Sequence, residues 1–141
     1  MKKLKILGLL FAILTIGCKA QTTEKEAITE AITAFSKAGD SNDANTLDTL
    51  LDTNYRVVMN RLFGSKTVSV VTKAEYLKKI KTKEWGGDSR ELTIENIVIN
   101  GTVSSAKVTF KGKKATIVSI LILVKNEKGI WKLVNDTPIF K

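Results

Sequence analysis

The sequence predicts an α+β fold in which three helices, all in the N-terminal half of the chain, pack on one face of a curved antiparallel sheet. Capping motifs and helical spacing of apolar residues occur before residue 90, whereas alternation of apolar and polar residues dominates from there to the C-terminus. The chain has 141 residues, a single proline and no internal repeat, which indicates one folded domain.

The first residues have the composition of an export signal. Lysines at positions 2, 3 and 5 precede an apolar stretch from Ile6 to Ile16, which is too short to span a bilayer. The stretch ends in Leu14-Thr15-Ile16-Gly17-Cys18, which resembles the bacterial lipobox except at Thr15, where leucine is usual. We therefore expect lipid attachment at Cys18, with ordinary signal cleavage after Ala20 as the alternative.

These observations divide the chain into a signal peptide (1–17), a tether (18–23) and a folded domain (24–141). They predict an exported protein that a lipid anchors to a membrane, in the periplasm or at the outer membrane. Loss of Lys2, Lys3 and Lys5 lowers the net charge from +9 to +6, and the lysines of residues 101–141 supply the excess. Such a region suits a solvated sheet face near an anionic envelope, and export argues against a nucleic-acid partner.

Each of the three predicted helices begins at a capping residue. The capping sites are Thr23-x-x-Glu26, Asn42 or Asp43, and Thr72-x-x-Glu75. Apolar residues then recur with helical spacing, which predicts buried faces at Ile28, Ile32, Phe35, Leu47, Tyr76 and Ile80. Gly39 is expected to end the first helix and Gly86-Gly87 to end the third.

The strands are predicted from the alternation of apolar and polar residues. Residues 55–63 and 66–71 form a hairpin around Gly64-Ser65, and Asn100-Gly101 is a turn between two later strands. The apolar phase slips at Glu95-Asn96, which predicts a β-bulge. Residues 117–124 are apolar in both phases apart from Ser119, so we expect a central strand that is covered on both faces.

The last strand is expected to begin at Trp131 and to end at Pro138, which cannot donate to a ladder. Trp131 and Leu133 share the inward phase, and Asn135 continues it. Asp136 falls on the outward phase. The alternation therefore places Asn135 inside the fold and Asp136 outside it.

Three segments resemble a known family: 55–61 (YRVVMNR), 85–90 (WGGDSR) and 129–138 (GIWKLVNDTP). Together with the order of elements, they are similar to the nuclear transport factor 2-like (SnoaL-like, cystatin-like) fold, and within it to the bacterial branch described as "putative lumazine-binding". The resemblance implies a cone that opens between the helices and the concave face of the sheet, where enzymes of this fold place Asp, Tyr or His. It also implies that the outer sheet face can support a homodimer.

Five residues are candidates for contacting a ligand in such a cone: Tyr55, Met59, Arg61, Trp85 and Asn135. Tyr55, Met59 and Arg61 share one phase of a strand, in which Arg61 either binds an anion or is solvated at the strand end. Trp85 either lines the mouth of the pocket or packs into the core. Asn135 either meets a ligand or satisfies a backbone group.

The composition excludes several chemistries. Without histidine there is no Ser–His triad, no Cys–His dyad, no His–Asp pair and no histidine metal site. A single cysteine excludes an intramolecular disulfide and a cysteine zinc cluster. We therefore expect no metal and no cofactor, and we assign no catalytic residue. An isomerase-type site needs a carboxylate and an oxyanion donor, for which Asp52, Tyr55, Tyr76 and Asp136 are available.

The favoured interpretation is a non-catalytic envelope lipoprotein whose domain binds a small molecule or an envelope partner. One alternative is a histidine-free isomerase or dehydratase on the same fold, so enzymatic activity stays open. The other is an accessory structural domain whose cone is filled by Phe35, Met59 and Trp85. A buried Asp–Tyr pair within hydrogen-bond reach would favour an enzyme, and an open cavity would exclude the filled cone.

Overall fold

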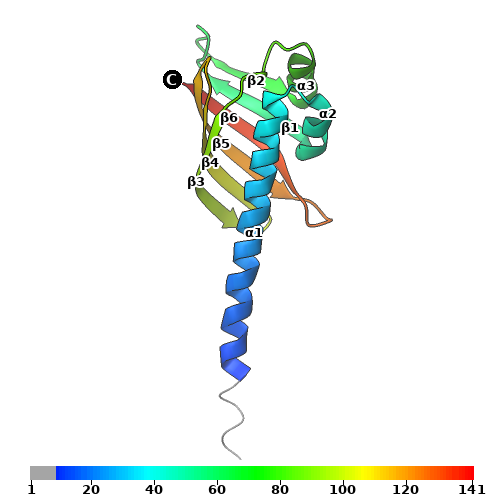
Figure 1. The fold of residues 1–141 in the computed structure, drawn as a ribbon, viewed down its shortest axis with the longest axis vertical. Helices are drawn as coiled ribbons and strands as arrows, with labels where there is room; N and C mark the ends of the chain where they lie inside the picture. The colour runs from blue at the N-terminus through cyan, green and yellow to red at the C-terminus, as the bar shows by residue number, and fades with distance from the viewer. Residues whose placement is uncertain (1–8) are drawn as a thin grey trace, which may run out of the picture.

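A computed structural model describes the backbone of residues 9–141 and the side chains of residues 23–141. In this part of the chain, three helices and six strands follow one another, and the strands form one sheet (Figure 1). The elements are α1 (Leu9–Asp40), α2 (Ala44–Leu50), β1 (Leu51–Asn60), β2 (Val68–Thr72), α3 (Lys73–Lys81), β3 (Glu91–Asn100), β4 (Val103–Lys111), β5 (Thr116–Lys125) and β6 (Trp131–Phe140).

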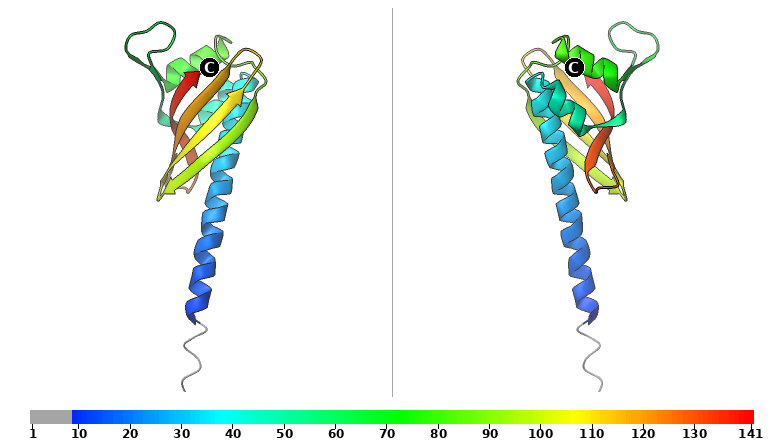
Figure 2. Two further views of the ribbon diagram at one scale, coloured as in Figure 1. Left: turned by 90° about the vertical axis from the view of Figure 1, so that its left-hand side faces the viewer. Right: turned by 90° about the vertical axis from the view of Figure 1, so that its right-hand side faces the viewer.

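The strand order across the sheet is β2-β1-β6-β5-β4-β3. Every neighbouring pair is antiparallel except β1 and β6, which run parallel. The helices lie on one face of the curved sheet (Figure 2), and the core fills the space between the two layers. The predicted α+β fold is therefore confirmed.

Helix α1 is longer than the sequence predicts. It is already helical at Leu9, so Thr23 lies in its interior instead of at its start, and residues 18–23 are helical. Neither proline nor glycine occurs between Cys18 and Thr23, so no residue of this segment strongly opposes the helix. Further along, Ile28 and Ile32 are buried against the sheet, as predicted.

Part of the predicted export signal lies outside the described residues. This holds for residues 1–8 and for the side chain of Cys18, so signal cleavage and lipid attachment stay predictions. Among the described residues, no helix has both the length and the apolar content needed to cross a membrane.

The two shorter helices begin at the predicted caps. Asp43 caps α2, and its carboxylate accepts a hydrogen bond from the backbone N–H of Thr46 at 3.0 Å. Thr72 caps α3 in a reciprocal capping box, in which the Thr72 N–H donates to Glu75 Oε2 at 2.8 Å. Helix α3 is anchored by Tyr76 and Ile80, which are both buried.

The predicted bulge in β3 is confirmed. Glu95 pairs with Lys107 and Val98 pairs with Ser105, so two residues of β3 lie opposite Ala106. Asn96 adopts a φ of 51°, a left-handed conformation that asparagine tolerates better than most residues. The bulge keeps the apolar residues on both sides of it on the inner face of the sheet.

Strand β6 differs from the prediction in two ways. Pro138 does not end the strand, which continues to Phe140. The register also shifts, because Leu133 pairs with Leu123 whereas Asn135 pairs with Ile122, which leaves Val134 as an extra residue. This bulge reverses the phase that follows it, so Asp136 is buried on the inner face and Asn135 lies on the outer face.

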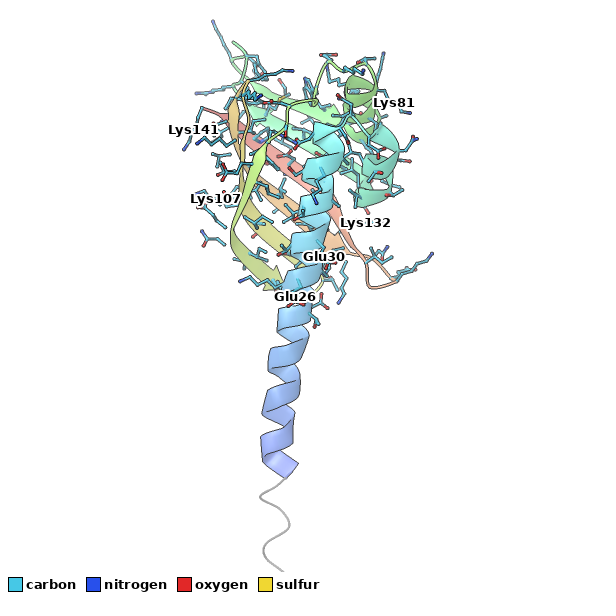
Figure 3. All side chains as sticks on the ribbon, viewed as in Figure 1. Glu26, Glu30, Lys81, Lys107, Lys132 and Lys141 are labelled. Carbon is cyan, nitrogen blue, oxygen red and sulfur yellow. The ribbon has the colours of Figure 1, made fainter. Side chains whose placement is uncertain are left out.

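Strand β5 is central in the sheet, but only its inner face is covered. Ser119, Leu121 and Leu123 are buried, whereas Ile120 on the other face is 44% exposed. The prediction that both faces are covered is therefore wrong for this chain alone, because the helices lie on one side of the sheet only. Figure 3 shows Lys107 and Lys141 on the side of the domain away from α2 and α3, and Lys81 and Lys132 on the other side.

Candidate functional site

A cavity of about 380 Å³ opens between the inner face of the sheet and the helices. Its mouth lies at the end of the domain where α1 terminates and where the chain ends (Figure 1). Most of its lining is apolar, and includes Phe35, Val57, Met59, Tyr76, Ile80, Trp85, Phe110, Ile117 and Pro138. Small-molecule sites have volumes of about 300–1,000 Å³. The cavity excludes the filled cone, although all three residues expected to fill it line the pocket.

The buried polar side chain among the lining residues is that of Asp136 on β6. Asp136 is 9% exposed, and its Oδ1 accepts a hydrogen bond from Ser119 Oγ on neighbouring β5. Burial raises the pKa of Asp136 to about 6, while the Ser119 hydrogen bond and the charge of Arg90 oppose that rise. The pocket thus has a single buried acid in a mainly apolar surround.

Two tyrosines lie close to this carboxyl. Tyr76 lines the pocket, and its ring meets that of Tyr55 edge-on at a centroid distance of 5.3 Å. Burial raises the pKa of both phenols, and the nearby charge of Asp136 raises them further. The Tyr55 hydroxyl is fully buried and has no hydrogen-bond partner among the described residues. Neither tyrosine donates a hydrogen bond to Asp136 in this structure, where Ser119 holds it.

Trp85 forms one wall, on the segment between α3 and β3. This segment is fastened to the end of α1, because Asn42 Nδ2 donates to the carbonyls of Ile80 at 3.1 Å and of Trp85 at 2.7 Å. Gly86 follows with a φ of 80°, and a Cβ there would lie 2.4 Å from the carbonyl oxygen of Gly39. Only glycine therefore allows this close approach, which places Trp85 at the pocket.

Arg90 lines the pocket near its mouth and is held by α1. Its Nε donates to Asp40 Oδ1 at 2.5 Å, and its Nη2 donates to the Ser36 carbonyl at 3.3 Å. The guanidinium also lies over the ring of Phe110, 4.7 Å from the centroid. Because Asp40 neutralises Arg90, this arginine is a structural clamp between α1 and β3 and does not pair with Asp136.

The five residues predicted to contact a ligand lie in different places relative to the pocket. Met59 and Trp85 line the pocket, and Tyr55 is buried beside it without lining it. Arg61 is exposed beyond the end of β1 with a φ of 54°, so the solvated alternative holds. Asn135 lies on the outer face, where its Nδ2 donates to Thr137 Oγ1 at 2.9 Å. The prediction of Asn135 as an inward residue is therefore wrong.

Asp136 is the residue that the sequence analysis placed on the wrong face. Strict alternation from Trp131 assigns it outward, because the bulge at Val134, which is followed by Asn135, was not predicted. Two signals were available: Asn135, a residue type that strands disfavour, and Pro138, which is more easily accommodated where a ladder is irregular. Phe63 and Phe140, which line the mouth, were likewise not singled out as contacts.

Several solved structures share this fold. A nuclear transport factor 2-like protein of unknown function from Silicibacter pomeroyi DSS-3 matches with a TM-score of 0.75 at 12% identity, over 86% of this chain and 98% of its own. A second, from Shewanella baltica OS155, matches with a TM-score of 0.74 at 16% identity, over 85% and 95%. A ketosteroid isomerase-like protein from Erwinia carotovora atroseptica SCRI1043 gives 0.64 at 15% identity, over 82% and 94%.

At these identities the likeness establishes the fold and nothing more about activity. No curated protein sequence matches the chain significantly. A family model described as "Putative lumazine-binding" matches residues 23–137, which is most of the chain and includes the strands that bear Asp136 and Ser119. The protein therefore belongs to the putative lumazine-binding family, on the nuclear transport factor 2-like fold.

Proposed function

We propose that this protein is an exported lipoprotein whose domain binds a small, mainly apolar molecule in the pocket without transforming it. The observation that carries the binding function is the open cavity of about 380 Å³, with apolar walls around one buried carboxyl. Apolar side chains that line an open cavity gain packing contacts when a molecule of matching shape binds there. The family description, which names a small heterocycle, supports the same function.

The hydrogen bonds favour binding over catalysis. An isomerase-type acid–base site combines a carboxylate with an oxyanion donor in an apolar pocket. Asp136 has a raised pKa, but its hydrogen-bond partner is Ser119, and the Tyr55 hydroxyl has no partner among the described residues. An enzyme remains the alternative, and turnover of a bound molecule would establish it.

The proposed anchor fits the shape of the chain. The N-terminal half of α1, which contains Cys18, extends from the domain at the end opposite the pocket mouth (Figure 1). A lipid on Cys18 would therefore leave the mouth open to the aqueous phase. The outer sheet face, where Ile120 is exposed, is the surface that we propose for a homodimer or an envelope partner.

The binding function is tested by native mass spectrometry of the protein isolated from its own envelope. We expect a bound small molecule in the wild type and its loss in Ala115→Trp, which places an indole in the pocket lining. Thr109→Trp, on the outer face of the adjacent β4, is the matched control and should retain the molecule. Equal occupancy in wild type and Ala115→Trp would contradict binding in this pocket.

A further inference from the structure

The pocket is elongated and apolar along most of its length. On β6 its lining residues are Asp136, Pro138 and Phe140, which alternate along the strand and, at about 3.3 Å per residue, span about 13 Å. Phe140 is 38% exposed and Asp136 is 9% exposed, so the pocket runs along this strand from the surface into the core. An apolar chain gains about 0.8 kcal/mol for each methylene that it buries. A pocket of this shape therefore suits a molecule with an extended apolar tail.

Two aromatic rings border the mouth of the pocket. Phe63, on the loop between β1 and β2, meets Phe140 edge-on at a centroid distance of 5.0 Å. Phe63 is 75% exposed, which leaves a large apolar surface in water next to the cavity. The part of a tail that leaves the pocket would lie against these rings and cover them. The apolar surface thus continues from the interior of the pocket to its outside.

Two of the charged residues that line the pocket are neutralised within the protein. Arg90 Nε donates to Asp40 Oδ1 at 2.5 Å, and Lys79 Nζ donates to Glu84 Oε1 at the same distance. Opposite charges in such close contact largely cancel at the distance of a ligand. Neither pair therefore determines which charge a ligand carries.

The other charged side chains at the mouth are mainly cationic. Lys83, just after α3, and Lys114, in the β4–β5 turn, both line the pocket and are exposed. Their ammonium groups form no hydrogen bond or ion pair with the described residues. The carboxylate of Asp88 also lines the pocket, and its Oδ2 accepts a hydrogen bond from the backbone N–H of Lys114 at 3.1 Å. Lys113, exposed and likewise without an ion pair, adds a further positive charge. The mouth therefore favours an anionic group over a cationic one.

The interior of the pocket requires no polar group from a ligand. Asp136, its buried acid, already accepts a hydrogen bond from Ser119 Oγ. The buried side-chain polar atoms that have no partner among the described residues are Tyr55 Oη and Ser104 Oγ, and neither residue lines the pocket. An anionic group placed inside would lose its hydration and meet the charge of Asp136. The inner end of a ligand is therefore apolar, and its anionic end lies outside.

We propose that the pocket binds an anionic amphiphile with a single apolar tail, which lies along β6 inside the pocket and leaves its anionic head at the mouth beside Lys83 and Lys114. This inference rests on the proposed binding function and specifies the class and the orientation of the ligand. The head is a carboxylate or a phosphate, since lysine forms charge-assisted hydrogen bonds with both. Fatty acids and single-chain phospholipids have this chemistry.

The test uses probes that share one tail and differ in the head. Decanoate and decyl phosphate are anions, and decylammonium is the cation with the same tail. Titration calorimetry on the mature chain with Cys18→Ser, which carries no lipid, measures their dissociation constants below micelle-forming concentrations. We expect the tighter of the two anions to bind at least about tenfold more tightly than decylammonium, and it identifies the head as carboxylate or phosphate. Acetate and inorganic phosphate, which have no tail, should not bind measurably.

Paired substitutions locate the head. Lys83→Gln with Lys114→Gln removes both free cations and should reduce the preference for the anion to about threefold or less. Lys25→Gln with Lys128→Gln is the matched control, because these exposed lysines also form no ion pair and do not line the pocket. The control removes the same charge and should keep the tenfold preference, while thermal unfolding verifies the fold of both proteins.

Each other outcome has a distinct meaning. Equal or tighter binding of decylammonium overturns the anionic class but leaves the binding function intact. Binding of acetate or inorganic phosphate as tight as that of the amphiphiles overturns the role of the tail. An unchanged preference in the protein with Lys83→Gln and Lys114→Gln overturns the position of the head. Failure of every probe overturns the inference but spares the binding function if the envelope-purified protein carries a small molecule, and it overturns both if that protein carries none.

Discussion

Ser119 and Asp136 form a buried hydrogen-bonded pair on adjacent strands, and Asp136 lines the pocket. The pair exists because Val134 is an extra residue in β6, which moves Asp136 from the outer to the inner face. A carboxylate in this position opposes stability, since the apolar surround disfavours its charge. The fold tolerates this cost at a residue that lines the pocket.

The first prediction concerns stability and pH. The pKa of Asp136 rises from 3.8 to about 6 on folding, so the protonated carboxyl is favoured in the native state. Its contribution to stability is full below pH 3.8 and is lost as the pH rises through about 6, a loss of about 3 kcal/mol. At pH 7.5 the free energy of unfolding of Asp136→Asn should therefore exceed that of the wild type by about 1–3 kcal/mol, as measured by chemical denaturation. At pH 4 the two proteins should be equally stable.

Glu127→Gln, in the exposed β5–β6 turn, controls for the lost charge and should have the stability of the wild type at both pH values. A lower stability of Asp136→Asn at pH 7.5 would contradict the burial of an ionised carboxyl.

The second prediction concerns the close approach at Gly86. Both Gly86 and Gly101 have positive φ, but a Cβ on Gly101 would meet nothing within 4 Å. Gly101→Ala should cost about 1–2 kcal/mol through its backbone conformation. Gly86→Ala should cost about 3 kcal/mol or more, because its methyl also collides with the Gly39 carbonyl. Chemical denaturation measures the free energy of unfolding of both variants. Equal losses of stability would show that the contact between α1 and the Trp85 segment does not contribute to stability.

The third prediction concerns the bulge in β3. Deleting Asn96 should move the residues on one side of the bulge to the opposite face and lower the free energy of unfolding by about 3 kcal/mol or more. Asn96→Gly, which keeps the residue count and accepts the φ of 51°, should stay within about 1 kcal/mol of wild type. A deletion variant that melts at the wild-type temperature would refute the role of the bulge.

The fourth prediction concerns Cys18. We expect the mature protein in the membrane fraction to begin at Cys18 and to carry the mass of several acyl chains, since one chain alone anchors only weakly. Cys18→Ser should abolish the added mass and release the protein from the membrane. Intact-mass measurement decides, and a mature chain that begins at Gln21 without lipid would rule out the anchor.

The fifth prediction concerns the outer sheet face. Ile120 is 44% exposed on that face, whereas Leu121 is buried on the inner face. If the protein is a homodimer, Ile120→Lys should give a folded monomer, and Leu121→Lys should impair folding itself. Light scattering and circular dichroism separate the two effects. A monomeric wild type at high micromolar concentration would exclude the dimer, which needs about 1,200–2,000 Å² of total buried area.

Features specified by neighbouring residues were predictable from the sequence. The caps at Asp43 and Thr72, the slip at Asn96 and the alternation of β4 each depend on contacts within a few residues, so composition and spacing reveal them. The order of these elements predicted the helices, the sheet and the α+β class. Met59 and Trp85 were found for the same reason, since their phase and their place beside a helix end are local properties.

The chemistry of the pocket was decided by tertiary structure alone. Whether Asp136 or Asn135 faces inward depends on how β6 registers against β5, where Leu133 pairs with Leu123 and Asn135 with Ile122. Asn135, beside Val134, is a residue type that strands disfavour, but a residue type alone does not fix how two strands register. A one-residue slip exchanges the two faces of a strand, so the sequence determined the fold while the register of β6 against β5 determined whether the pocket contains the carboxyl of Asp136 or the amide of Asn135.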